Sequence, residues 1–230
     1  MDKSKLVITI ERQYGSGGRI VGKKLAEELG ISFYDDEILS MTAEKSAVGE
    51  KYFRLADEKA GNNLLRKIVG NLRFPAGIFE EPKKEGDVTS PDNLFRFQAE
   101  VIRELASAES CVIVGRCADY ILETSGKTDL VKIFVYADLS TCVRRTQETD
   151  GITDTKEALN KLNRITKQRK SYHKYFTGKE WEDVTNYDLP INASKLELDQ
   201  VVELIKDYIR MIGYEGAEYD RYDDDGVSTL

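Results

Sequence analysis

The chain contains the sequence Glu11-Arg-Gln-Tyr-Gly15-Ser-Gly17-Gly18-Arg19, a glycine-rich turn between two regular segments. Before it, the β-branched run from Leu6 to Ile10 predicts a buried strand. After it, residues 18–29 carry apolar side chains at helical spacing. The glycines let the backbone turn tightly and direct successive amides inward. With the positive end of the following helix, such a turn predicts a polyphosphate site, although a turn without any ligand would also use glycine.

The turn departs from the standard phosphate loop, G-x-x-x-x-G-K-[ST], in which the lysine reaches the phosphates and the hydroxyl holds Mg²⁺. Gly18 stands where the lysine is expected, Arg19 comes next, and Ile20 has no hydroxyl. The guanidinium of Arg19 could supply the missing charge, because guanidinium groups bind phosphate well. The predicted phosphate-binding residues are Gly15, Ser16, Gly17, Gly18 and Arg19, and no metal ligand is assigned.

Strand-like and helix-like segments alternate along the chain. The predicted strands are residues 6–10, 31–34, 111–114, 131–136 and 187–192. The predicted helices are residues 18–29, 93–108 with Asp92 as a cap, 139–149, 155–175 and 196–212. Residues 37–109 are expected to be mainly helical, with a long loop at 74–91. This alternation predicts an α/β fold, a three-layer α/β/α domain with a five-stranded parallel sheet.

Composition indicates one soluble globular domain. The 230 residues are 40% hydrophobic and 33% charged. No apolar run is long enough for a bilayer, and the first strand is too short for a signal peptide, so we expect a cytoplasmic protein with no membrane partner. Cys111, Cys117 and Cys142 lack metal-ligand spacing and are expected to be reduced thiols. His173 is the one histidine, which argues against a zinc site or a serine–histidine hydrolase.

The formal net charge of −7 is unevenly distributed. Residues 213–230 contain six acidic residues and one arginine, a charge of −5, and predict a disordered acidic tail; the rest of the chain carries −2. An acidic protein is a poor candidate for nucleic-acid binding. Residues 144–174, by contrast, contain nine Lys or Arg against four Asp or Glu. This basic segment suits either an anionic ligand or a solvated helix face.

An ordered set of motifs resembles the cytidylate kinase-like family of P-loop nucleoside monophosphate kinases. The motifs are residues 10–19, residues 25–35 (Leu-Ala-Glu-Glu-Leu-Gly-Ile-Ser-Phe-Tyr-Asp), residues 111–116 (Cys-Val-Ile-Val-Gly-Arg), Arg144-Arg145, residues 169–172 and residues 187–194. The resemblance implies one P-loop kinase-like domain over residues 1–212, with a helical acceptor-binding insertion at about 37–109 and a basic lid at about 144–180. It also implies nucleotide substrates, ATP as phosphoryl donor, and Mg²⁺.

The resemblance assigns roles to individual residues. Those implied to act on the transferring phosphoryl group are Arg19, Arg144, Arg145 and Arg169, since phosphoryl transfer depends on positioning and on cations around the oxygens. Those implied on the acceptor side are Asp35 and Arg116, with Arg96 and Asp119 as further candidates. Some alternatives stay open. Arg116 could pair with Asp119 instead, Asp35 could cap the next helix, and only one of Arg144 and Arg145 need face the site.

Several positions differ from the family pattern, mostly on the acceptor side. Cys117 stands in place of an Asp, Asp36-Glu37 in place of Ser-Gly, Met41 in place of a basic residue, and Thr166 in place of an acidic one. Three functions stay open. The first is phosphoryl transfer to a small acceptor, most simply a nucleoside monophosphate such as CMP. The second is nucleotide-dependent regulation on the same fold, and the third is hydrolysis of a nucleoside triphosphate without an acceptor. A homo-oligomer is compatible with all three.

Overall fold

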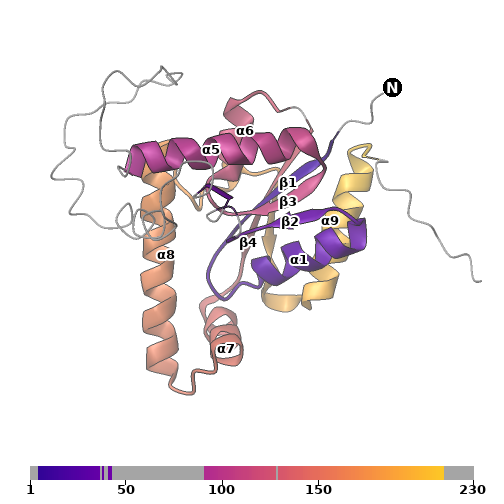
Figure 1. The fold of residues 1–230 in the computed structure, drawn as a ribbon. Coiled ribbons are helices and arrows are strands. Elements are labelled where there is room, and N and C mark those ends of the chain that lie inside the picture. The colour runs from indigo at the N-terminus through magenta and orange to yellow at the C-terminus, as the bar shows by residue number, and fades with distance from the viewer. Residues whose placement is uncertain (1–4, 37, 39–40, 43–90, 128, 215–230) are drawn as a thin grey trace, which may run out of the picture.

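The computed structural model describes residues 5–36, 38, 41–42, 91–127 and 129–214. Five strands form one sheet in the order β2-β3-β1-β4-β5, and all of the strand pairs are parallel. Helices cover both faces of the sheet (Figure 1). The predicted three-layer architecture is therefore confirmed.

The strands are β1 (Val7–Arg12), β2 (Ser32–Tyr34), β3 (Cys111–Val114), β4 (Leu130–Tyr136) and β5 (Leu189–Asn192). Each of the five predicted strands is present. The central strand β1 pairs with β3 on one side and with β4 on the other. Because all of the strands run in the same direction, their carboxyl ends lie along one edge, where parallel sheets bind ligands.

Side-chain alternation along β1 divides the core into two layers. Ile8 and Ile10 pack with α1 (Gly18–Leu29) and α9 (Leu198–Met211) on one face of the sheet. Val7 points to the other face, where it packs with α5 (Pro91–Ala108) and α6 (Ala118–Thr124). The sequence did not predict the short helix α6. Helix α5 begins at Pro91, a favourable first helical residue, so Asp92 lies in its first turn and does not precede it as a cap.

Two further helices extend from the carboxyl edge. Helices α7 (Leu139–Asp150) and α8 (Thr155–Thr177) are each capped by an aspartate, Asp138 and Asp154, whose side chains accept from backbone amides of the first turn. In Figure 1 the lower part of α8 lies beside α7 and its upper part reaches α5. There Phe95 and Phe176 stack with their ring centroids 4.1 Å apart. The helix that carries Arg169 is thus anchored to the α5 layer. The remaining elements are the short helices η1 (Val184–Asn186) and η2 (Ala193–Lys195).

Some expectations fall outside the described residues. Most of the proposed insertion, almost all of the loop predicted at 74–91, and the tail from residue 215 belong to this group. In the part of the chain that the structure describes, no helix combines the length and the apolar character needed to cross a membrane.

Gly22 allows α1 to lie close to the sheet, and a larger residue there should destabilise the protein. A Cβ at this position would lie 3.0 Å from Cγ2 of Val114 and 3.1 Å from Cδ1 of Ile10, both buried. We expect Gly22→Val to lower the free energy of unfolding by about 1–3 kcal/mol through overpacking, as measured by urea denaturation.

The control is Lys23→Val, which introduces the same side chain at the next residue, where the native side chain is 67% exposed. It should change the free energy of unfolding by less than about 0.5 kcal/mol. A loss in Gly22→Val no larger than the loss in Lys23→Val would contradict the tight contact between Gly22 and the sheet.

Candidate active site

The glycine-rich turn fits tightly between two helices. Gly15 and Gly17 have φ angles of 75° and 92°. A Cβ on Gly15 would lie 2.3 Å from the carbonyl oxygen of Cys142 in α7, and one on Gly17 would lie 2.5 Å from Cδ2 of Leu198 in α9. Both the backbone conformation and the lack of space therefore require glycine.

The start of α1 has no side-chain cap. The N-cap residue Gly17 has no side chain, and the first turn of α1 contains no acidic residue. The buried Ser16 hydroxyl donates to the carbonyl oxygen of Gln13 at 2.9 Å and accepts from the amide of Gly18 at 3.4 Å, so it stabilises the turn from within. First-turn amides have no acceptor inside a helix, and phosphate satisfies them well.

Arg145 holds the turn in place, whereas Arg144 faces away from it. The Arg145 guanidinium donates to the carbonyl oxygen of Ser16 at 2.7 Å and to those of Ala193 and Leu196 at 3.1 and 3.2 Å. Arg144 is 59% exposed and pairs with Glu148 one turn along α7. Of the two adjacent arginines, only Arg145 contacts the phosphate-loop region, and it does so through the backbone of the turn.

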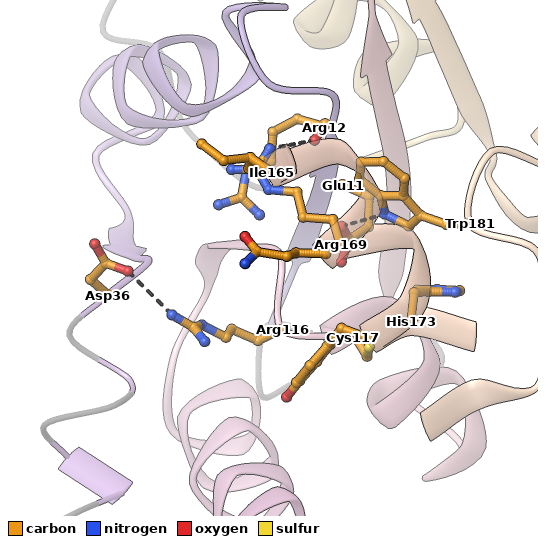
Figure 2. A pocket seen from close by; sticks show the side chains of 11 residues that line it. Glu11, Arg12, Asp36, Arg116, Cys117, Ile165, Arg169, His173 and Trp181 are labelled. Carbon is orange, nitrogen blue, oxygen red and sulfur yellow. Dashed lines mark hydrogen bonds and ion pairs between the residues drawn. The ribbon is translucent and has the colours of Figure 1, made fainter. Parts of the chain in front are cut away.

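A pocket of about 230 Å³ lies between the carboxyl edge of the sheet and α8. Figure 2 shows the side chains of Arg12, Arg116 and Arg169 reaching into it from the end of β1, from the β3–α6 turn and from α8. Its volume is below the range of about 300–1,000 Å³ that is typical of pockets enclosing a whole drug-sized ligand. The pocket therefore suits an anionic group the size of a phosphate.

Arg169 joins the long helix to the central strand. Its guanidinium donates to the carbonyl oxygen of Arg12 at 2.8 Å and lies 5.6 Å from the ring centroid of Tyr14. Burial, with the nearby charge of Arg12, lowers the pKa of Arg169 to about 9. The group still carries its charge at neutral pH, and an anion would relieve the repulsion between the two guanidinium groups.

Arg116 is presented on an unusual stretch of backbone. Gly115, Arg116 and Cys117 have consecutive positive φ angles of 76°, 63° and 54°. For residues other than glycine this conformation costs roughly 1–2 kcal/mol each, and such strain is concentrated at functional sites. The amide of Gln98 supports the turn by donating to the carbonyl oxygen of Arg116 at 3.2 Å. The turn directs the side chain of Arg116 into the pocket, where it pairs with Asp36 at 3.2 Å.

Asp35 lies between two arginines at the end of β2. It is 2% exposed, its carboxylate lies 3.4 Å from Nη2 of Arg12, and it also pairs with Nε of Arg19. Arg19 itself is on the surface, with 62% of its side chain exposed. The structure thus brings Arg19 and Asp35 together, and it adds Arg12 to them.

Of the four acceptor candidates only Arg116 lines the pocket; Asp35, Asp119 and Arg96 do not. Asp119 is buried in the first turn of α6, 3.6 Å from Nε2 of His173, and so lies behind the pocket wall. Arg96 lies on α5, with its guanidinium carbon 5.4 Å from the ring centroid of Phe97. The spacing of Asp119 and Arg96 along the chain did not predict that their side chains lie outside the pocket.

Sequence reasoning missed the charged and aromatic residues around Glu11. The carboxylate of Glu11, at the end of β1, accepts a hydrogen bond of 2.9 Å from the indole of the buried Trp181, which lies 170 residues away. Burial, with the charge of Asp119, raises the pKa of Glu11. Burial lowers the pKa of His173, but Asp119 and Glu11 outweigh it and raise that pKa overall. The only available signal was that Glu11 and Arg12 directly follow a buried strand.

The described residues contain no group of three or more His, Cys, Asp or Glu side chains arranged to hold a metal ion. Magnesium needs no such group, because it is usually bound by one or two carboxylates, by waters and by substrate phosphates. Asp36 fits this pattern, since its side chain lines the pocket and is 59% exposed.

Comparison with known proteins identifies the family. The model of the cytidylate kinase-like family matches residues 7–195. The chain belongs to the cytidylate kinase-like family. It is 25% identical over 224 residues to a cytidylate kinase from Pyrococcus horikoshii, covering 96% of this chain and 98% of the relative. It is 26% identical over 199 residues to a cytidylate kinase from Methanosarcina mazei, covering 86% and 93%.

A solved structure resembles the chain over most of its length. An uncharacterized protein from Eubacterium ventriosum matches with a TM-score of 0.63 and 28% identity, covering 90% of this chain and 99% of that one. Membership of the cytidylate kinase-like family, together with the glycine turn and the three-layer fold, supports a nucleotide kinase. The resemblance drawn from the sequence motifs is confirmed.

Substituting Arg145 and its neighbour Arg144 in turn tests whether Arg145 stabilises the glycine turn. Arg145→Ala removes three hydrogen bonds to backbone carbonyls, and we expect it to lower the free energy of unfolding by about 2–3 kcal/mol. Arg144→Ala removes an exposed ion pair and should cost less than about 0.5 kcal/mol. Denaturant unfolding of the two variants checks this, and similar losses would contradict the role given to Arg145.

The buried Glu11 carboxyl group should make stability depend on pH. Its pKa is raised in the folded protein above its ordinary value of 4.5, so the stabilising effect is complete below pH 4.5 and is lost as the pH rises through the folded-state value. We expect Glu11→Gln, whose amide oxygen can still accept from Trp181, to gain melting temperature relative to wild type between pH 5 and pH 8.

Thermal unfolding at a series of pH values provides the measurement. The exposed Glu148→Gln serves as the control, because it also replaces one carboxyl group by an amide but lies on the surface of α7. If the difference for Glu11→Gln were independent of pH, the carboxyl group would be titrating as it does in the unfolded chain.

Proposed function

We propose that this protein transfers the γ-phosphoryl group of ATP to a nucleoside monophosphate, with CMP as the first candidate acceptor. The observation that carries the proposal is the convergence of Arg12, Arg116 and Arg169 on one pocket beside the glycine turn. Phosphoryl transfer requires little covalent chemistry from the protein. It requires cations around the oxygens of the transferring group and an arrangement that brings donor and acceptor into line.

The geometry suggests a division of roles. The glycine turn at residues 15–18 and the start of α1 would bind the phosphates of ATP. Arg116, next to Asp36, would bind the phosphate of the acceptor, and Arg169 would lie over the transferring group from α8. Arg145 acts as a positioning residue, because its contacts are with the backbone of the turn.

The remaining parts of the proposal follow from the family. Mg²⁺ would accompany ATP, held by its phosphates and by Asp36, and would neutralise charge on the β- and γ-phosphates. Residues at about 37–109 would form the acceptor-binding insertion, and residues at about 144–180 the lid. The protein would work in the cytoplasm on small nucleotides, without nucleic acid or membrane as partners.

A second candidate is a nucleotide-binding regulatory protein with little transferase activity. Gly18 replaces the lysine of the standard phosphate loop, and Arg144 pairs with Glu148 on the surface of α7. Both observations reduce the number of cations available to the transferring group. This candidate predicts that the protein binds ATP tightly but forms no product with any acceptor.

A phosphotransfer assay distinguishes the two candidates. Mg-ATP is supplied with CMP, dCMP, UMP, AMP, GMP or no acceptor, and both ADP and the phosphorylated product are followed. We expect one pyrimidine monophosphate to form its diphosphate. Arg116→Ala should raise the KM of that acceptor by about 10- to 100-fold, because a charge-assisted hydrogen bond contributes about 1.5–3 kcal/mol.

Arg144→Ala is the control and should retain the wild-type KM, because Arg144 is exposed on α7 and paired with Glu148. Release of ADP at the same rate with and without acceptors would indicate a nucleotide hydrolase. Tight ATP binding with no turnover would favour the regulatory candidate.

A further inference from the structure

We propose that Arg12 supplies the positive charge that the phosphate-loop lysine supplies in the standard motif, an inference that rests on the proposed triphosphate site. Aligned on G-x-x-x-x-G-K-[ST], residues 12–19 place Arg12 at the first glycine and Gly18 at the lysine. The chain thus has an arginine where the motif has glycine and a glycine where the motif has lysine. Each arrangement therefore has one cationic side chain and one glycine at these two positions, in opposite order.

The structure shows that the two positions are in direct contact. A Cβ on Gly18 would lie 2.6 Å from Cβ of Arg12 and 3.2 Å from its Cγ. Gly18 does not have a positive φ angle, so its backbone conformation would accept a side chain. The side chain of Arg12 therefore fills the space beside the first residue of α1, from which the lysine of a standard loop would extend.

From this position the Arg12 guanidinium reaches the pocket. It passes Gly115, where a Cβ would lie 2.0 Å from Nη1, and its Nη2 lies 3.4 Å from Oδ1 of Asp35. It lines the pocket together with Arg116 and Arg169, as Figure 2 shows. Only 15% of the side chain is exposed, and Nε is buried without a hydrogen-bond partner among the described residues. A buried donor of this kind is expected to find an acceptor, and a phosphate oxygen would provide one.

Three adjacent parts of the protein hold Arg12. Asp35 pairs with its guanidinium, Arg169 donates to its backbone carbonyl at 2.8 Å, and Gly115 leaves room for its head group. Asp35 thereby acts as a positioning residue for Arg12. These contacts order the arginine before any nucleotide binds, which reduces the entropy lost on binding.

The test compares binding of ATP and of AMP to the full chain by isothermal titration calorimetry, together with turnover. We expect Arg12→Met, which keeps a long side chain but removes the charge, to weaken ATP binding by about 10- to 100-fold, the loss of a charge-assisted hydrogen bond. AMP, which lacks the β- and γ-phosphates, should bind within about 3-fold of wild type. Arg12→Lys should retain part of the preference for ATP.

Exchanging the residues at positions 12 and 18 tests whether Arg12 acts through its charge or only through packing. Arg12→Gly alone should lose the preference for ATP, and the double variant Arg12→Gly/Gly18→Lys, which restores the order of glycine and lysine in the standard motif, should regain it. Gly18→Lys alone should destabilise the protein, because Arg12 occupies the space that its side chain needs. Arg144→Met, exposed on α7, is the matched control and should leave both affinities unchanged.

The outcomes separate this inference from the proposed function. An unchanged ratio of ATP to AMP affinity in Arg12→Met would overturn it, as would a double variant no better than Arg12→Gly. So would a wild-type protein that binds ATP no more tightly than AMP. If wild type prefers ATP and the exchange restores that preference, but no acceptor is phosphorylated, the role of Arg12 stands and the kinase proposal fails.

Discussion

The lack of space beside the glycine turn is the constraint on which the rest of the site depends. Gly15 lies so close to α7 that even a methyl group would meet the Cys142 carbonyl oxygen at 2.3 Å. This contact sets the position of α7 against the turn, and from there Arg145 can reach the backbone of Ser16. Because the packing determines where the turn lies, it also determines where the amides of α1 point.

The pocket is lined by three positively charged side chains, and nearby carboxylates neutralise only part of this charge. Arg12, Arg116 and Arg169 line it. Asp36 also lines it and pairs with Arg116, and Asp35 pairs with Arg12. Burying charges in this way is costly unless an anion completes the arrangement. The lowered pKa of Arg169 and the strained backbone at Arg116 are further signs that the pocket is not arranged for stability alone.

Buried polar side chains adjoin the arginines. Glu11, Trp181 and His173 line the pocket, and Asp119 of α6 pairs with His173 behind the pocket wall. Their contacts connect the central strand with α6, with α8 and with the segment after it. A change in protonation here would reach Arg12 directly, since Glu11 is its neighbour on β1.

Local patterns in the chain were enough to predict the class of fold. Buried strands such as 111–114, the helix from Gly18 to Leu29 and the turn between strand and helix all depend on residues close in sequence. The short helix α6 was missed because its seven residues carry too little periodicity. The expected insertion lies largely outside the described residues and stays a prediction.

The arrangement of the site depends on long-range contacts much more than the class of fold does. Sequence motifs identified Gly15, Arg116 and Arg169, since each lies in a recognisable pattern. Only the tertiary structure separated Arg144 from Arg145, because helical geometry turns neighbouring side chains to different faces and the surroundings decide which face binds. Likewise, Arg12 lies beside Gly18 only because the turn folds back on the end of β1. Hydrophobic periodicity is a local property and can be read from any short segment of the chain. Charged residues that are far apart in sequence come into contact only when the sheet and helices pack together.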